Sequence, residues 1–220
     1  MPKNNEREYR DMMLAIAERA EDETEESEEK RVEGYATTFN EPYVLYEDNE
    51  IIYREQVDPD AFRNTDMDDV IMQYDHEGRV FARTSNNTLT VNPDDKGLFI
   101  SADLGGTEIG RNLYEEIRGG YTDKMSFGFI VDDDDEIRTD AEDGRTDILR
   151  TIRSISKLFD VSAVSLPANN GTSIGATTRS RIDGVIEEIR TERSEAEKLE
   201  LEKRRAELRA RALGKEITND

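Results

Sequence analysis

The order of apolar and polar residues predicts a series of short β-strands between residues 32 and 175. β-branched and aromatic residues gather in short runs bounded by charged residues, Asn, Gly or Pro, which is the pattern of strands and turns. In chain order the runs read VEGYATTF, EIIYREQV, VIMQYDH, TLTV, GLFISADL, KMSFGFIV and FDVSAVSL. About eight strands with one or two helices indicate a mainly-β or α+β domain rather than a parallel, doubly wound one.

One helix is expected within this domain, at residues 107–120. Thr107 suits the N-cap position, and Gly119 with Gly120 suits the end of a helix. Three apolar residues between them share one helical face: Ile109, Leu113 and Ile117. The acidic stretch DDDDEIRTDAEDGRTD, residues 132–147, is expected to be a loop because of its composition.

Two flanking segments differ from this domain, so the predicted division is 1–31, 32–178 and 179–220. The first segment is expected to begin with a short helix and to end in a disordered acidic tail. The apolar residues of that helix recur at helical spacing: Met12, Met13, Ile16 and Ala20. In the last segment, residues 181–213 are rich in Glu, Lys, Arg, Leu and Ala, which predicts a long charged helix able to form a coiled coil.

The charge and the composition exclude several kinds of partner and chemistry. A net charge of −22 would repel a polyanion, so no nucleic-acid partner is expected. The chain has no cysteine, which excludes disulfides, thiol catalysis and zinc sites built on thiolates. No run approaches the ~18 apolar residues of a membrane span, and the N-terminus lacks the apolar core of a signal peptide. We expect a soluble, acidic, cytoplasmic protein with no membrane partner.

Two residues carry most of the candidate chemistry, His76 and Ser126. His76 is the single histidine, and histidine, with an ordinary pKa of ~6.5, exchanges protons near neutral pH. Ser126, within KMSFGF, becomes a nucleophile only if a base lies within hydrogen-bond reach, and is otherwise a core serine. A lone histidine is more often structural than catalytic, so the residues by themselves leave both interpretations open.

A histidine base needs an acidic residue that orients its ring. Asp75 and Glu77 adjoin His76 but would point away from it in a strand. Asp160 lies among apolar residues in FDVSAVSL, where a carboxylate needs a partner, and is the better candidate.

Metal binding is the other chemistry considered. Residues 132–143 resemble a calcium loop in acidity alone and lack its spacing, so no metal or cofactor is expected.

Six stretches occur in one order along residues 32–170: VEGYATTFN, YREQVDPDAF, YDH, GLFISADL, KMSFGF and FDVSAVSLPA. Together they resemble the prohead, or capsid maturation, serine proteases of tailed bacteriophages. The resemblance implies a serine endopeptidase whose β-barrel core, with peripheral helices, is similar to that of the herpesvirus assembly proteases. It implies His76 as the general base, Ser126 as the nucleophile and Asp160, where many relatives have glutamate, as the orienting acid. Arg150 and Arg153 are considered as residues that help to place donors for the oxyanion.

The resemblance also implies partners and a location. The major capsid protein, with its scaffolding segment, would be the substrate, and the protease would cleave itself and associate with copies of itself. It would act in the host cytoplasm, inside the immature capsid, and the helix at 181–213 would pair with scaffold helices.

Two alternatives to the protease stay open at this point. A catalytically inactive scaffold or assembly chaperone of the same fold would keep His76 and Ser126 apart. An acidic, β-rich ion- or partner-binding module would depend on calcium for its stability and would not need Ser126.

Overall fold

The computed structural model describes residues 6–12, 17–18, 30–164 and 176–216 of the chain. The chain divides into two compact units, Met1–Arg179 and Ser180–Asp220. The first unit is built from two β-sheets and one short α-helix, and the second unit continues a long helix. The prediction of a mainly-β protein with a C-terminal helix is therefore confirmed.

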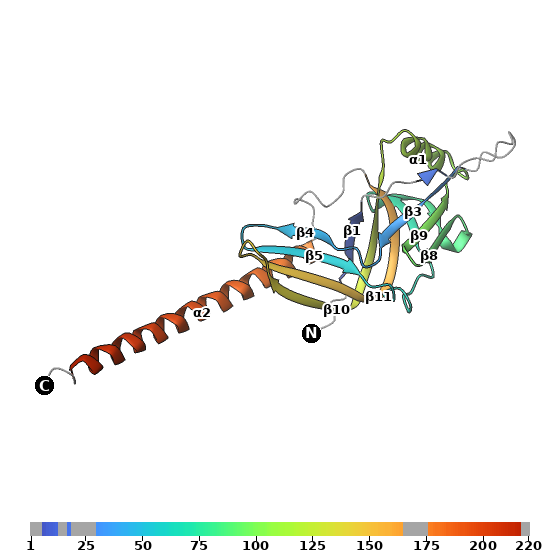
Figure 1. Cartoon of the computed structure of the whole chain (residues 1–220). Helices are drawn as coiled ribbons and strands as arrows, with labels where there is room; N and C mark the ends of the chain where they lie inside the picture. The colour runs from blue at the N-terminus through green and yellow to red at the C-terminus, as the bar shows by residue number, and fades with distance from the viewer. Residues whose placement is uncertain (1–5, 13–16, 19–29, 165–175, 217–220) are drawn as a thin grey trace. The chain divides into compact units, whose positions relative to one another are not determined.

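The larger sheet has seven strands (Figure 1). Five of them lie in the order β1-β10-β11-β5-β4, while β6 pairs with β11 and β7 pairs with β6. Their bounds are β1 Glu8–Met12, β4 Tyr43–Glu47, β5 Ile51–Val57, β6 Ile71–Tyr74, β7 Glu77–Arg83, β10 Lys124–Asp140 and β11 Thr146–Val164. The long strand β11 carries β10 antiparallel on one edge, and on the other edge β5 and β6 follow one another in parallel. This arrangement places β6 beside the part of β11 that also pairs with the start of β10.

The smaller sheet has four strands in the order β2-β3-β9-β8. Their bounds are β2 Ala17–Glu18, β3 Arg31–Thr38, β8 Leu89–Pro93 and β9 Gly97–Asp103, with a 3₁₀ turn, η1, at Thr84–Asn86. Among the described strands, the two sheets meet in an isolated bridge between Phe39 and Val57 and do not close on one another. The predicted β-barrel core is therefore wrong: both sheets are open, because their edge strands β4, β7 and β8 do not pair across the gap.

The hydrophobic core takes side chains from both sheets and from α1 (Glu108–Arg118). Phe127 and Phe129 are fully buried and stack with ring centroids 4.5 Å apart. The helix was predicted and is confirmed, since the Thr107 side chain accepts from the Gly110 N–H and Leu113 and Ile117 are buried.

Successive residues of a strand point to opposite faces of the sheet. In SFGF the two phenylalanines enter the core, so Ser126 and Gly128 lie on the other face.

The acidic stretch at 132–147 is a hairpin, so the predicted loop is wrong. β10 continues to Asp140 and β11 begins at Thr146. The acidic strand pairs with a partner strand that supplies positive charge, as in the pair between Asp135 and Arg153 at 2.8 Å. The Tyr53 hydroxyl also donates to Glu136, at 2.6 Å. Composition alone predicted a loop because it does not show that arginines of β11 lie opposite the carboxylates of β10.

The N-terminal helix is also wrong where the structure describes it. Glu8–Met12 form strand β1, antiparallel to β10, and Ala17–Glu18 form β2. Glu8 and Arg10 are buried on one face, a period of two that fits a strand and not a helix. The predicted helix residues Met13, Ile16 and Ala20 lie outside the described residues.

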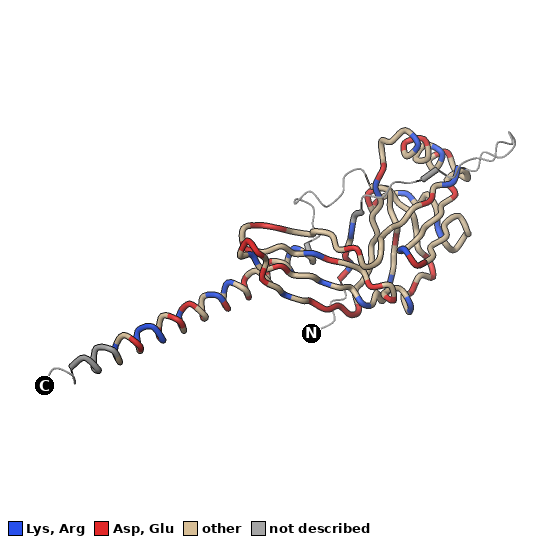
Figure 2. Tube along the Cα trace, viewed as in Figure 1, with Lys and Arg blue, Asp and Glu red and all other residues tan. Residues whose placement is uncertain are grey.

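The second unit is helical, as predicted. It contains most of α2 (Ala176–Glu216), along which acidic and basic residues alternate (Figure 2). Leu199, Leu201 and Leu208 are exposed. Among the described residues, no helix is both long enough and apolar enough to cross a membrane.

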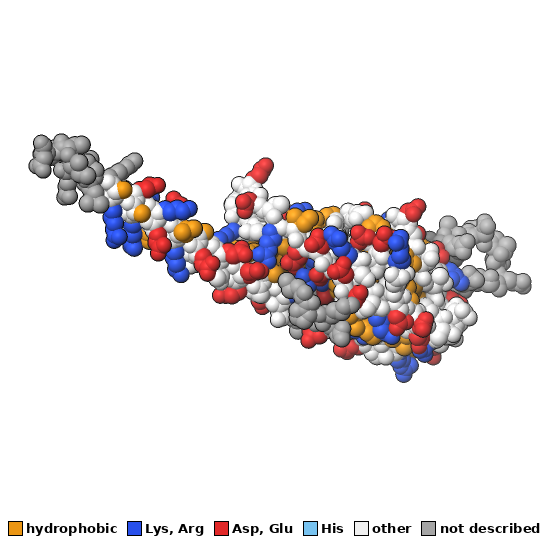
Figure 3. Space-filling model, turned by 90° about the horizontal axis from the view of Figure 1, so that it is seen from below, with side chains coloured by type: hydrophobic (Ala, Val, Ile, Leu, Met, Phe, Trp, Pro, Cys, Tyr) orange, Lys and Arg blue, Asp and Glu red, His pale blue; other side chains and the backbone are white. Residues whose placement is uncertain are grey.

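On the face seen in Figure 3, acidic and basic side chains are interspersed, and apolar side chains form only small patches.

Candidate active site

Ser126 lies near the start of β10, on the sheet face opposite the two core phenylalanines. It pairs with Ser162 of β11, and Gly128 pairs with Asp160. Directly opposed residues of antiparallel strands point to the same face, so these four residues share one face of the sheet. The register is interrupted next to this group, where Phe159 is an extra residue in β11. The bulge sends the side chains of both Phe159 and Asp160 toward the candidate site.

His76 lies in the tight turn between β6 and β7. Asp75 and His76 have φ angles of 49° and 59°, and Tyr74 pairs with Glu77 across the turn. Two residues with positive φ are typical of a two-residue hairpin, where Gly is the usual second residue. The Asp75 N–H donates to the Ala163 carbonyl at 2.9 Å, which ties the turn to β11. The sequence predicted His76 at a strand end, and the structure places it one step further, in the turn.

The structure brings together all three predicted site residues, although Ser126 and Asp160 lie 50 and 84 positions after His76 in the sequence. His76 Nε2 is 2.5 Å from Ser126 Oγ, and His76 Nδ1 is 2.5 Å from Asp160 Oδ2. With its proton on Nδ1, the ring donates to Asp160 and accepts from the Ser126 hydroxyl. Ser126 and Asp160 are 0% exposed, while the His76 side chain is 16% exposed.

Three further residues lie around Asp160 and His76 and were missed from the sequence. The Ser162 hydroxyl donates to Asp160 Oδ2 at 2.6 Å. Arg7 forms an ion pair with Asp160 Oδ1, and the Tyr9 ring lies 4.4 Å from the His76 ring. Spacing could have indicated Ser162, since it lies two residues after Asp160 in a strand. No local signal indicated Arg7 or Tyr9, because their place depends on the pairing of β1 with β10.

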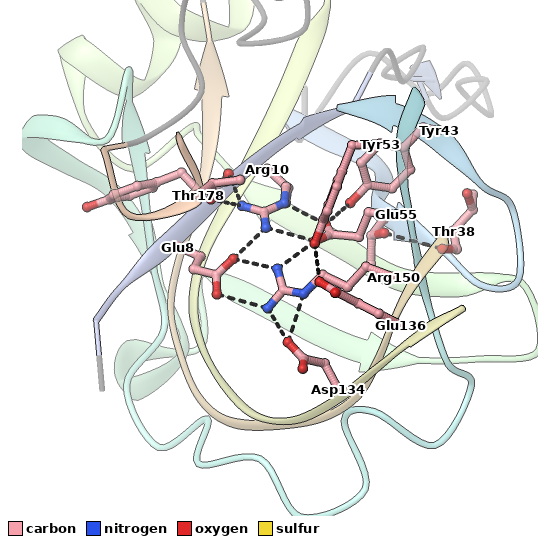
Figure 4. A network of polar contacts seen from close by, with 12 residues as sticks. Glu8, Arg10, Thr38, Tyr43, Tyr53, Glu55, Asp134, Glu136, Arg150 and Thr178 are labelled. Carbon is pink, nitrogen blue, oxygen red and sulfur yellow. Dashed lines mark hydrogen bonds and ion pairs between the residues drawn. The ribbon is translucent and has the colours of Figure 1, made fainter. Parts of the chain in front are cut away.

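A buried ion-pair network lies on the opposite face of β1 (Figure 4). Arg10 and Arg150 lie between Glu8 and Glu55. Arg10 Nε is 2.5 Å from Glu55 Oε1, and Arg150 Nη1 is 2.8 Å from Glu55 Oε2. Burial alone raises the pKa of Glu8, but the charges of Arg10 and Arg150 outweigh it and lower the pKa from 4.5 to about 2. The network fixes β1 to β5 and β11.

Neither arginine considered for the oxyanion lies at the site. Arg150 binds Glu8, Glu55 and Asp134 within the network, and its strand partner is Glu136, ten residues beyond Ser126 along β10. Arg153 forms an exposed pair with Asp135. The expectation that they help to place oxyanion donors is therefore wrong, because the acidic half of the hairpin binds both side chains.

The acidic hairpin has a partner for its charge within the chain. Asp134 binds Arg150 at 2.6 Å, and Asp135 binds Arg153. Within the ranges that the structure describes, no group of three or more His, Asp or Glu side chains could hold a metal ion.

Chemically, the arrangement can activate a hydroxyl. A serine bound to a histidine, which is in turn bound to a buried carboxylate, can transfer its proton as it attacks a carbonyl carbon. The carboxylate then stabilises the charged imidazolium.

Comparison with known proteins agrees with this chemistry. The family model described as caudovirus prohead serine protease matches residues 16–185. That range contains His76, Ser126 and Asp160 but begins after β1. No curated protein and no solved structure matches the chain.

Proposed function

The chain belongs to the caudovirus prohead serine protease family, and from this premise we propose that Ser126, His76 and Asp160 are its catalytic triad. Membership implies a serine protease of capsid maturation that acts within the phage capsid on a capsid protein. The observation that carries the assignment is the position of His76, with one ring nitrogen at Ser126 Oγ and the other at the buried Asp160 carboxylate.

The reaction follows from the geometry. Ser126 Oγ attacks the carbonyl carbon of the scissile peptide bond while its proton passes to His76 Nε2. The imidazolium, stabilised by Asp160, then gives this proton to the leaving amine, and the C–N bond breaks to leave an acyl-enzyme. His76 next takes a proton from water, the resulting hydroxide attacks the acyl carbon, and the proton returns to Ser126 Oγ as the acid product leaves.

The proposed substrate is the scaffolding segment of the major capsid protein, with cleavage of the protease itself as a second reaction. We also propose that residues 32–178 act as the protease domain, and that residues 179–220 form a scaffold-type segment that associates with its like inside the prohead. Support for the segment comes from its long, charged helix with exposed leucines.

The test is co-expression of the full chain with the major capsid protein, followed by intact-mass measurement over time. We expect the wild type to trim the capsid protein, whereas Ser126→Ala leaves it whole. Ser156→Ala is a matched control, because this serine is exposed on β11 and its hydroxyl donates to the Ile130 carbonyl at 3.3 Å. Processing by Ser126→Ala at the wild-type rate would overturn the proposed triad, and an inert wild type would favour the inactive scaffold.

A further inference from the structure

The N-terminal strand β1 lies outside the family match yet pairs with the strand that carries the nucleophile. Its register places Tyr9 opposite Gly128 and Asp11 opposite Ser126. Opposed residues share a face, so Tyr9 and Arg7, two residues before it, lie on the face of β10 that carries the triad. The active-site face therefore includes a strand that the family match does not cover.

Arg7 and His76 bind different oxygens of one carboxylate. Asp160 Oδ2 contacts His76 Nδ1 and Ser162 Oγ, while the Arg7 guanidinium binds Oδ1. A carboxylate held on one side only could rotate about its Cβ–Cγ bond, whereas partners on both oxygens fix its plane. The ion pair also compensates a charge that is fully buried.

The chain has room for this ion pair because residue 128 is glycine. A Cβ at this position would lie 2.4 Å from Asp160 Oδ1 and 2.8 Å from both Nε and Nη2 of Arg7. Those distances are too short for a non-bonded contact of a Cβ atom, so the carboxylate and the guanidinium occupy the space that a side chain would take. The glycine of SFGF thus has a steric reason that involves Arg7 as well as Asp160.

Aromatic rings hold the guanidinium in place. The Arg7 guanidinium carbon is 4.5 Å from the Phe159 ring centroid and 5.0 Å from that of Tyr9. Tyr9 in turn contacts the His76 ring. On the other face, the Glu8 and Arg10 ion pairs anchor the strand. Arg7 is therefore fixed by its neighbours rather than being a loose surface arginine.

We propose that Arg7 is a positioning residue of the protease, which holds Asp160 Oδ1 so that Oδ2 faces His76. This inference rests on the proposed triad. Arg7 touches neither Ser126 nor the reacting atoms in the described contacts, and it acts through Asp160. Its positive charge also opposes the binding of a proton by the coupled His76–Asp160 pair, whichever of the two carries that proton. Further titratable groups near this pair are Tyr9, whose ring contacts His76, Asp75 and Glu77, which adjoin His76 in the chain, and Asp11, which is paired with Ser126.

The single histidine allows a direct test that does not depend on activity. In the Ser126→Ala background, the ring resonances of His76 are followed by NMR as the pH is varied, with and without Arg7→Gln. We expect the midpoint to move to higher pH when the charge of Arg7 is removed. Arg153→Gln removes an exposed arginine from the same sheet and should leave the midpoint unchanged. An unchanged midpoint in Arg7→Gln would overturn the proposal while leaving the triad intact.

Activity gives the second readout, with Ser126 present. Arg7→Gln should lower kcat/KM for capsid-protein cleavage about 10- to 100-fold, the cost of a slightly misplaced catalytic group, and move the acid limb of its pH profile upward. Arg7→Lys keeps the charge without the fork of the guanidinium, so it should keep the acid limb and restore part of the rate. If Arg7→Gln does not fold, Arg7→Lys decides: kcat/KM must fall several-fold with Tm retained, and an unchanged value contradicts the role. Failure of the proposed triad would be recognised separately, because Ser126→Ala would then retain activity.

Discussion

At the scale of single residues, His76 has a backbone conformation that is uncommon for any residue other than glycine. Its φ of 59° lies in the left-handed region, which costs a non-glycine residue roughly 1–2 kcal/mol. Glycine or asparagine would suit this turn position better. A residue that is costly for the fold and yet contacts both Ser126 and Asp160 is consistent with a functional role.

Replacing His76 should therefore separate activity from stability. His76→Asn removes the base but suits the left-handed conformation, so cleavage should fall on the order of 10⁴-fold or more. Its Tm should stay at or above that of the wild type, because Asp160 keeps Arg7 and Ser162 as partners. His76→Val, β-branched at the same position, should lose both activity and Tm. Cleavage assays and thermal unfolding measure the two effects, and a cleavage rate near wild type in His76→Asn would contradict the role of His76.

Gly128 offers a second test at this scale. In Gly128→Ala the new methyl group must displace Asp160 or Arg7, so we expect cleavage to fall about 100-fold together with a lower Tm. Gly106→Ala is the matched control, since a Cβ there meets nothing within 4 Å. Equal activity in the two variants would show that the Arg7–Asp160 pair is not needed where the structure places it.

The three residues of the proposed triad were predicted from the sequence, and the residues that support them were not. His76 and Ser126 lie in short stretches that resemble one family, and Asp160 was the acid with apolar neighbours in a strand. Arg7 and Tyr9 reach the site only because β1 pairs with β10, more than a hundred residues later. A pairing over that distance leaves no local pattern in the sequence.

At the scale of elements, β1 joins the site face to the buried network. Alternate residues point to opposite faces here. Arg7, which directly precedes β1, and Tyr9 face the proposed triad, whereas Glu8 and Arg10 face Glu55 and Arg150. Any change that loosens the network should therefore also disturb the site.

The network predicts sensitivity to acid. Glu8 has a folded-state pKa of about 2 against an ordinary value of 4.5, so it stabilises the fold above pH 4.5. That contribution, on the order of 3 kcal/mol, should be lost as the pH falls from 4.5 toward 2. Urea unfolding at pH 7, 4, 3 and 2 measures it. Glu8→Gln should be less stable at pH 7 and should depend less on pH over that interval.

Glu115→Gln is the control for this experiment. Glu115 is exposed and pairs with Lys30, so its loss should change the unfolding free energy little at any of these pH values. If Glu8→Gln kept the full acid dependence of the wild type, the stabilising role of its carboxylate would be refuted.

Several elements differ from their sequence prediction for a physical reason. The stretch at 132–147 is a hairpin because arginines of β11 compensate its carboxylates. β4 and β7 were missed, since β4 is a run of only five residues beside the polar stretch EDNE and β7 has three charged residues among its seven. Both find their partners only in β5 and β6. The open sheets differ from the predicted barrel because closure depends on edge pairing, which strand patterns do not specify.

At the scale of the whole molecule, the described contacts of the proposed triad all come from the first unit. Residues 191–210 of α2 are exposed along their length. The proposed triad and the part of the helix proposed to meet scaffold partners therefore belong to different units of the chain.

Truncation of the helix should separate the two roles. Ending the chain after residue 194 should leave the cleavage of a short soluble peptide within about twofold, because the described contacts of the proposed triad all belong to the first unit. Incorporation into proheads should fall severalfold, measured by quantifying the protease in purified particles. Full incorporation of the shortened chain would contradict the proposed role of residues 195–220.

The most direct measurement for the central claim is covalent labelling of the serine. The full-length wild type is treated with a phosphonofluoridate, which reacts with activated serine hydroxyls, and the labelled peptide is identified by mass spectrometry. We predict one adduct on Ser126 and none in His76→Asn, because the hydroxyl needs His76 to take its proton. Labelling of Ser126 at the same rate in both proteins, or in neither, would contradict a triad built on His76.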